Sequence, residues 1–250
     1  NRALTDFFEP GSTFKMVAAG AALNEKLVKL SDTIFCENGS FSAGGRVLHD
    51  HHPYGNLTVQ RVVEVSSNIG MAKLGMRLGE TKFYDYIKKF GFGQLTGIPL
   101  PGEVSGISRP PSRWSKLSIT RIPMGQEIAA TPLQMAMAYA AVANKGVLMK
   151  PRIIKSITDP NGRVVVEYPV TMVRRVLSEA AVKHLTTALK GVVGDAGTAA
   201  KAEVKGYSVA GKTGTAQKVD PDGRYSHRNF YSSFVGFVPA EDPQLLVMVA

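Results

Sequence analysis

Glu9-Pro10-Gly11-Ser12-Thr13-Phe14-Lys15 is the stretch around which the rest of this chain is organised. Pro10 and Gly11 end an extended segment, and the helix formers and apolar residues that follow predict a helix over Ser12 to Lys26. Lys15 comes three residues after Ser12, so both side chains are expected on one face of that helix. The sequence therefore predicts a hydroxyl beside an amine at a helix N-terminus, where unpaired N–H groups favour negative charge.

This serine–lysine pair is a candidate nucleophile and base. A serine hydroxyl attacks poorly unless a base takes its proton. A lysine can be that base if burial or a second cation lowers the pKa of its amine. The S-x-x-K pattern alone fits an N-cap serine followed by a solvated lysine equally well, and such matches arise by chance. Other parts of the sequence have to decide between the two interpretations.

Two further motifs favour the catalytic interpretation of the serine–lysine pair. Ser66-Ser67-Asn68 is the only S-x-N in the chain, Lys212-Thr213-Gly214 is the only K-T-G, and Ser12 to Lys15 is the only S-x-x-K. They occur in the order expected for a helix start, a connection between helices and a late strand. Penicillin-binding proteins and class A β-lactamases carry this set of motifs.

The residue types match a serine acyl-transfer mechanism. Ser12 is the expected nucleophile and forms the acyl-enzyme, and Lys15 accepts its proton. Lys212 is the second cation that keeps Lys15 neutral. Ser66 is expected to relay a proton to a leaving amine, and Asn68 to hydrogen-bond the substrate amide. We take these five residues as the candidate catalytic group.

The K-T-G strand supplies the candidate substrate-binding residues. Thr213 and Thr215 offer hydroxyls for a substrate carboxylate, and Gly214 lacks a side chain, so the substrate is expected to lie close against the strand. The backbone N–H groups of Ser12 and Thr215 are the expected oxyanion hole.

Composition describes a globular chain with a basic surface. Its 250 residues are 44% hydrophobic and 20% charged, with a net charge of +10. The Lys and Arg residues are not clustered among aromatics, so nucleic acid is not an expected partner. Cys36, the only cysteine, excludes an internal disulfide and a thiolate metal cluster and is expected to be buried. No run of the sequence reaches the length of a membrane span.

Helices predominate in the first three-quarters of the chain, and antiparallel strands are expected at its end, which indicates an α+β fold. Thr58, Gly79 and Thr131-Pro132 indicate helix ends, and Asp159-Pro160-Asn161-Gly162 indicates a hairpin. Residues 207–210, 230–238 and 244–249 are the expected late strands. Both ends of the sequence look cut, so we expect one domain over residues 1–250 that is truncated at each end.

Two other features have competing interpretations. His49-Asp50-His51-His52 contains metal-ligand types, but the residues are adjacent and Pro53 follows, so we favour a surface loop and no metal. Trp114, the only tryptophan, is either a substrate platform or a packing anchor. No cofactor is expected.

The chain resembles the transpeptidase domain of class B penicillin-binding proteins. The matching segments are residues 9–15, 66–71 and 212–217, together with Gly125-Gln126, Thr131 to Gln134 and Tyr231 to Gly236, so the resemblance covers nearly the whole chain. The Glu-Pro-Gly-Ser-Thr-Phe-Lys and Ser-Ser-Asn forms are most similar to the division-specific, septal branch. Met16 stands where many relatives have proline.

The resemblance implies a fold and an activity. The fold is that of penicillin-binding proteins and serine β-lactamases, an antiparallel sheet flanked by helices with a mainly helical subdomain. The activity is peptidoglycan D,D-transpeptidation, which cross-links stem peptides through a serine acyl-enzyme and is blocked covalently by β-lactams. The resemblance also implies a membrane anchor, a catalytic domain on the periplasmic or extracellular side, and cell-division membrane proteins and a glycosyltransferase as partners.

Three alternatives stay open at this point. A class A β-lactamase uses the glutamate of an E-x-x-L-N loop to deliver water, and no such sequence lies between Asn68 and Lys212. A D,D-carboxypeptidase differs only in its acceptor. A non-catalytic β-lactam sensor would be acylated without cross-linking.

Overall fold

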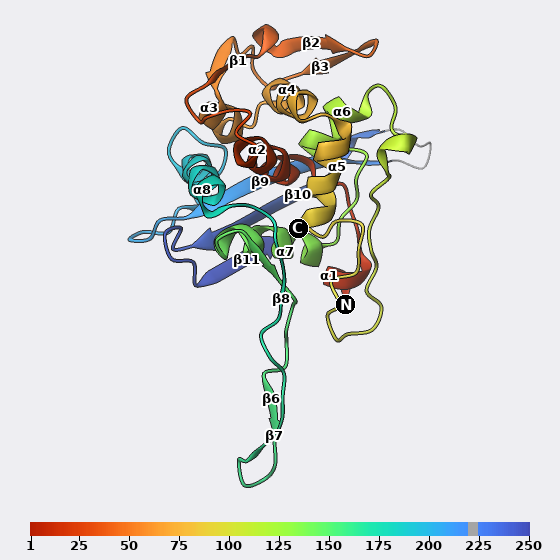
Figure 1. Ribbon diagram of the computed structural model, residues 1–250. Coiled ribbons are helices and arrows are strands. Elements are labelled where there is room, and N and C mark those ends of the chain that lie inside the picture. Colours follow the sequence, from red (N-terminus) through yellow and green to blue (C-terminus); the bar gives the residue numbers. More distant parts are fainter. Residues whose placement is uncertain (220–224) are drawn as a thin grey trace.

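The computed structural model describes residues 1–219 and 225–250, and it has the expected α+β architecture (Figure 1). The central sheet is antiparallel in the order β11-β10-β9. Its strands are β9 (Ala210–Val219), β10 (Tyr225–Val238) and β11 (Leu245–Val249). The first of these begins later than predicted, because Tyr207 pairs instead with Val204 in an isolated bridge.

The helix at the centre of the fold is α2 (Lys15–Asn24), and it differs from the predicted helix at both ends. The chain first makes a 3-10 turn, η1 (Gly11–Phe14), in which the Lys15 N–H donates to the Ser12 carbonyl. The helix stops before Lys26, whose φ of 55° is left-handed. Every residue from Lys15 to Leu23 is buried, so both faces of this helix are packed.

The other helices carry the end signals that the sequence predicted. The Thr58 hydroxyl accepts a hydrogen bond from the Arg61 N–H at the start of α3, and Gly79 is the C-cap of α4. Thr131 and Gln134 form a capping box on α7. The helices are α1 (Arg2–Thr5), α3 (Val59–Glu64), α4 (Asn68–Leu78), α5 (Glu80–Lys89), α6 (Ser118–Arg121), α7 (Pro132–Ala143) and α8 (Glu179–Val193), with short 3-10 turns η2 (Glu37–Gly39), η3 (Pro111–Arg113), η4 (Ile122–Met124) and η5 (Ala200–Ala202).

The sheet and the helices share one hydrophobic core. Helix α8 packs against β9, and α7 packs against β10 and β11 (Figure 1). Helix α2 contacts α4, α5 and α8. Beyond α4 lie two small antiparallel pairs, β1 (Thr33–Phe35) with β4 (Asn56–Thr58) and β2 (Ser40–Ala43) with β3 (Arg46–His49). The expected mainly helical subdomain is therefore α3 to α6 with these strands.

A long arm projects from the other end of the molecule (Figure 1). Its base is β5 (Val147–Met149) paired with β8 (Met172–Arg175), and its tip is the hairpin of β6 (Ser156–Thr158) and β7 (Val164–Glu167). The Asp159-Pro160-Asn161-Gly162 turn joins the hairpin strands, as predicted.

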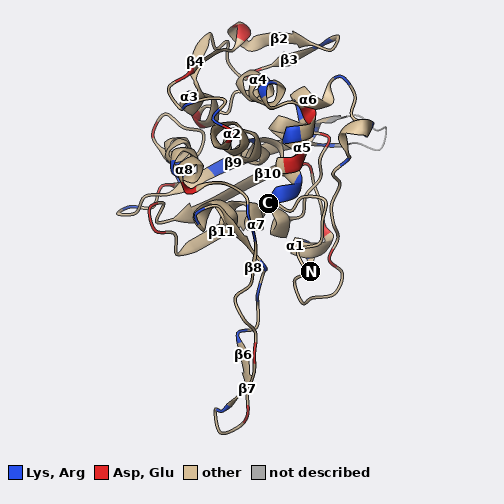
Figure 2. Cartoon of the chain, in the orientation of Figure 1, with Lys and Arg blue, Asp and Glu red and all other residues tan. Residues whose placement is uncertain are grey.

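Several smaller predictions are settled by the packing. Cys36 is buried. Trp114 is a packing anchor, because its ring lies edge-on to Phe83 and Tyr84 and its Nε1 donates to the Arg109 carbonyl. Lys and Arg are dispersed along the chain (Figure 2). Within residues 1–219 and 225–250, none of the helices is both long and apolar enough to cross a membrane.

Candidate active site

The Ser12 turn is pressed against the K-T-G strand by glycines. A Cβ on Gly11 would lie 3.1 Å from the Thr215 carbonyl oxygen, and a Cβ on Gly214 would lie 2.8 Å from the Pro10 carbonyl oxygen. From the other side, Gly125 approaches Gly11 so closely that a Cβ there would be 2.1 Å from its carbonyl oxygen. We call Gly11, Gly125 and Gly214 the glycine contact. It fixes the turn carrying Ser12 on β9.

Gly214 also has a structural role that the sequence did not predict. We expected its missing side chain to leave room for substrate. In the structure, a Cβ on Gly214 would meet Ser233, Pro10 and Thr13, the nearest at 2.6 Å. The glycine makes room for the protein's own Ser12 turn.

Lys15 joins the first motif to the second. Its side chain is completely buried, and its Nζ donates to the Ser66 carbonyl oxygen at 2.6 Å, to Ser66 Oγ at 3.1 Å and to Asn68 Oδ1 at 2.7 Å. Burial, and next the positive charge of Lys212, lower the pKa of Lys15 well below its usual value. An amine with a lowered pKa can accept a proton near neutral pH, as the sequence required of this lysine.

Lys212 is the second buried amine. Its Nζ donates to the Thr213 carbonyl oxygen at 3.2 Å, and burial lowers its pKa to about 7. Its strand position pairs it with Val235 of the central strand β10. The predicted electrostatic influence of Lys212 on Lys15 is thus present in the structure.

Ser66 is held in an unfavourable backbone conformation. Its φ is 61°, in the left-handed region that serine rarely adopts. This conformation turns both its carbonyl and its hydroxyl toward Lys15. Backbone strain of this kind gathers at functional sites, where neighbouring contacts hold it in place.

The substrate-binding candidates lie along the same strand. Thr215 is exposed, and Thr213 is half-buried with its hydroxyl 2.9 Å from that of Thr198. The backbone of Thr215 lies beside Gly11, the residue that precedes Ser12. The structure thus brings Lys15, Ser66 and Asn68 into direct contact, and it sets the turn that carries Ser12 against Gly214 and Thr215.

Asp50 is the residue that the sequence prediction missed. We read His49 to His52 as a surface loop, but its aspartate turns inward to the second motif. The Asp50 carboxylate accepts from Ser67 Oγ at 2.6 Å, from the Ile69 N–H at 3.1 Å and from the Asn68 N–H. No local sequence pattern pointed to Asp50, because its hydrogen-bond partners lie 17 to 19 residues further along the chain. Within the described parts of the chain, no group of three or more His, Cys, Asp and Glu residues could hold a metal ion.

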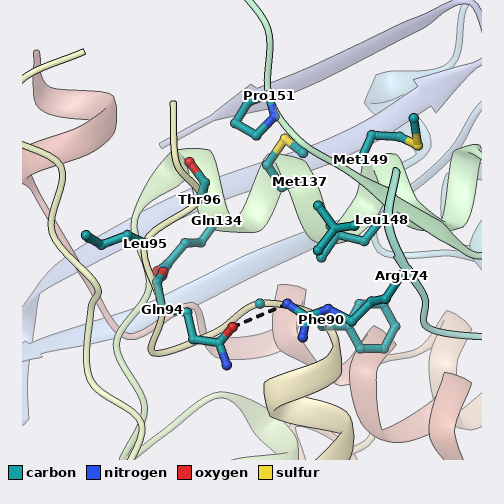
Figure 3. Close-up of a pocket in the computed structure, with 12 residues that line it drawn as sticks. Phe90, Gln94, Leu95, Thr96, Gln134, Met137, Leu148, Met149, Pro151 and Arg174 are labelled. Carbon is teal, nitrogen blue, oxygen red and sulfur yellow. Dashed lines mark hydrogen bonds between the residues drawn. The ribbon is translucent and has the colours of Figure 1, made fainter. Parts of the chain in front are cut away.

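A small cavity elsewhere takes no part in this site. It has a volume of about 50 Å³ and lies between the end of α5, α7 and the β5–β8 pair (Figure 3). Arg174 Nη2 donates to Gln94 Oε1 at 3.3 Å at its edge. None of the candidate residues lines it.

The family comparison agrees with this geometry. The family described as penicillin binding protein transpeptidase domain matches residues 1–250. The chain belongs to the penicillin-binding protein transpeptidase family. The predicted resemblance to class B penicillin-binding proteins is therefore confirmed, and so is the fold class.

Named members of the penicillin-binding protein transpeptidase family give the context. The chain is 42% identical over 246 residues to stage V sporulation protein D of Bacillus subtilis, covering 97% of this chain and 38% of that protein. It is 33% identical to the peptidoglycan D,D-transpeptidase FtsI of Escherichia coli K12, covering 100% of this chain and 40% of that protein. The chain thus spans about two-fifths of the length of these relatives.

Solved structures are similar over nearly the whole chain. Penicillin-binding protein 3 of Mycobacterium tuberculosis, complexed with aztreonam, is 37% identical with a TM-score of 0.92, covering 99% of this chain and 57% of that one. The apo transpeptidase domain of Burkholderia pseudomallei penicillin-binding protein 3 is 33% identical with a TM-score of 0.90, covering 99% and 72%.

Proposed function

We propose that this chain is the catalytic domain of a serine D,D-transpeptidase that cross-links peptidoglycan stem peptides and is acylated by β-lactams. The observation that carries the proposal is the buried amine of Lys15, the first residue of α2. Its pKa is lowered, and it donates hydrogen bonds to Ser66 and Asn68. Family membership and the FtsI relative support the same activity.

In the acylation step, Ser12 Oγ attacks the carbonyl carbon of the penultimate D-alanine while the Lys15 amine takes the hydroxyl proton. The N–H groups of Ser12 and Thr215 stabilise the oxyanion. The C–N bond then breaks, and the departing D-alanine amine receives its proton through Ser66. The product is an ester on Ser12.

In the second step, an amine from a neighbouring stem peptide attacks this ester. Its proton passes to Lys15 or Ser66, and the C–O bond to Ser12 breaks as a new peptide bond forms. The proton then passes to Ser12 Oγ, which leaves as a free hydroxyl. Asn68 holds the amide of the donor peptide in both steps, whereas Thr213 and Thr215 hold its terminal carboxylate only during acylation, before the terminal D-alanine leaves. A cleft of about 390 Å³ next to Gln217 is lined by two arginines, Arg46 and Arg121, and by one carboxylate, Glu127, so its charged lining carries an excess of positive charge that suits an acidic peptide.

The cellular setting is a further part of the proposal. We propose that residues 1–250 form one transpeptidase domain on the periplasmic or extracellular side of the cytoplasmic membrane, acting in septal wall synthesis. Cell-division membrane proteins and a glycosyltransferase are the proposed partners. The FtsI and penicillin-binding protein 3 relatives support this setting.

The test is acylation of the full chain by benzylpenicillin, followed by intact mass and peptide mapping. A stable one-to-one adduct on Ser12, absent from Ser12→Ala and retained in the exposed Ser31→Ala control, is expected. An adduct retained in folded Ser12→Ala would overturn the assignment of the nucleophile.

A second assay separates the alternative activities. Turnover of a D-alanyl-D-alanine thioester in the presence of an acceptor amine is expected to give the cross-linked product. Hydrolysis only, with the amine ignored, would indicate a carboxypeptidase. Acylation without any turnover would indicate a sensor, and rapid loss of the penicilloyl adduct would indicate a β-lactamase.

A further inference from the structure

Asp50 is the acidic side chain that contacts the Ser66-Ser67-Asn68 motif. One carboxylate oxygen accepts from Ser67 Oγ, and the other accepts from the N–H groups of Asn68 and Ile69, the first two residues of α4. A negative charge is favoured at a helix N-terminus. Asp50 therefore binds the motif through one side-chain and two backbone donors at once.

These contacts determine how Asn68 is oriented. The Asn68 amide nitrogen donates to the His49 carbonyl oxygen at 3.0 Å, so Asn68 Oδ1 is the atom left to accept from Lys15. His49 is the last residue of β3, and Asp50 follows it, so both hydrogen-bond partners of the second motif come from one short segment. His49 and Asp50, whose contacts the sequence prediction missed, thus hold the second motif in place.

The Asp50 contacts also lie next to Ser66, the residue with the strained backbone. The left-handed Ser66 persists only if its neighbours hold it, and the next two residues are both bonded to Asp50. Loss of the Asp50 contacts would free the turn that presents the Ser66 carbonyl and hydroxyl to Lys15.

Asp50 acts on Lys15 through charge as well. The groups that face Lys15 are Lys212 from β9, Ser66 and Asn68 from the α3–α4 connection, and Asp50. Asp50 raises the pKa of Lys15, against burial and Lys212, which both lower it. Cys36 and Tyr54 also lie within the electrostatic reach of Asp50, and its charge raises the pKa of each.

We propose that Asp50 is a positioning residue of the transpeptidase site, which holds the Ser66-Ser67-Asn68 turn in register with Lys15 and supplies the negative charge that balances the two buried lysines. The proposal rests on the proposed function and adds a residue to it. Asp50 acts through the residues that it binds, Ser67, Asn68 and Ile69.

The experiment measures the pseudo-first-order acylation constant of the full chain with excess benzylpenicillin between pH 5 and 9. This constant does not depend on how much of the sample is folded. Asp50→Asn keeps the shape and removes the charge, and Asp85→Asn on the exposed face of α5 is the matched control. At pH 7, Asp50→Asn is expected to be acylated at least about tenfold more slowly.

The pH profile distinguishes positioning by charge from simple support. Without the Asp50 charge, the pKa of Lys15 falls, so its amine stays neutral to lower pH. The acidic limb of the Asp50→Asn profile is therefore expected to move to lower pH by about half a unit or more. An equal loss of rate at every pH, with the limb unmoved, would mean that Asp50 is only a helix cap and would overturn the proposal.

Two further variants at Asp50 test whether the shift of the acidic limb depends on its charge. Asp50→Ser is a second neutral cap, and it is expected to shift the limb in the same direction. Asp50→Glu, which keeps the charge, is expected to return the limb to the wild-type position. A limb displaced equally in the glutamate variant would contradict the proposal. If wild type itself is not acylated at Ser12, the proposed function fails, whereas acylation with an unmoved limb removes only the role of Asp50.

Discussion

At the scale of single residues, the site depends on two buried lysines, Lys15 and Lys212, and no carboxylate of residues 1–219 and 225–250 forms an ion pair with either of them. Burial opposes the charged form of each amine, and the two positive charges oppose one another. Hydrogen bonds to carbonyl and amide oxygens keep each Nζ satisfied. The consequence is that the pKa of each amine lies below the ordinary lysine value, and that of Lys212 falls to about 7.

Removal of the Lys212 charge tests this electrostatic coupling. Lys212→Gln removes a charge that lowers the pKa of Lys15, so that pKa is expected to rise, and the acidic limb of acylation to move to higher pH. This direction is opposite to that expected for Asp50→Asn. The measurement is the same pH series of acylation constants, with the exposed Lys183→Gln as control. A limb that stays in place or moves to lower pH would show that Lys212 does not tune Lys15.

At the scale of elements, the site is assembled by close approach of backbones. The Ser12 turn, the chain at Gly125 and strand β9 approach one another at the glycine contact, where no side chain could fit. The turn begins as a tight 3-10 helix and continues into the wholly buried α2. Ser12, the proposed nucleophile, is thus held by packed backbone on both sides.

Gly214→Ala is expected to separate the strand from the Ser12 turn. Its new methyl would lie 2.8 Å from the Pro10 carbonyl oxygen, and backbone cannot give way as a flexible side chain can. We expect acylation by benzylpenicillin to slow by at least about tenfold, because small displacements at a reactive site are costly. Gly194→Ala, whose methyl would have only an ordinary contact at 3.6 Å, is the control. Equal acylation constants in the two variants would contradict the role given to the glycine contact.

The same contrast explains what could be predicted from the sequence. Caps at Thr58 and Thr131 depend on residues three positions away, so local patterns reveal them. The three catalytic motifs are rare enough to be recognised without a fold. The Asp50 bonds join residues 17 to 19 positions apart, and the Gly214 contact reaches the Ser12 turn from the far end of the chain. Such contacts exist only after folding, so sequence patterns did not reveal them.

At the scale of the whole molecule, the buried lysines link folding to pH. In the unfolded chain the pKa of Lys212 returns to about 10.5, whereas in the folded protein it is about 7. Between these values the unfolded state binds more protons, so the free energy of unfolding rises with pH. Burial raises the pKa of Tyr139, and the pKa of Tyr86 is raised to about 12, so ionisation of these tyrosines in the unfolded chain reverses the trend near pH 10.

We therefore expect the thermal midpoint to rise as the pH increases from 7 to 9. The rise is expected to be smaller in Lys212→Gln, which removes one of the lysines whose pKa is lowered by folding, and unchanged in Lys183→Gln. Thermal unfolding followed by circular dichroism at constant ionic strength measures it. A midpoint that falls over this range in wild type, or rises equally in Lys212→Gln, would show that Lys212 is charged and well solvated in the folded state.

The projecting arm has a consequence for how the molecule opens. The hairpin of β6 and β7 is an isolated two-stranded ribbon whose valines, Val164 to Val166, are all exposed. A ribbon of this kind is marginally stable alone, so its amide hydrogens exchange through local fraying. Amides of α2 sit in the core, and they exchange only when the whole domain unfolds. A protease is thus expected to cut the arm without unfolding the core that carries Ser12, the proposed nucleophile.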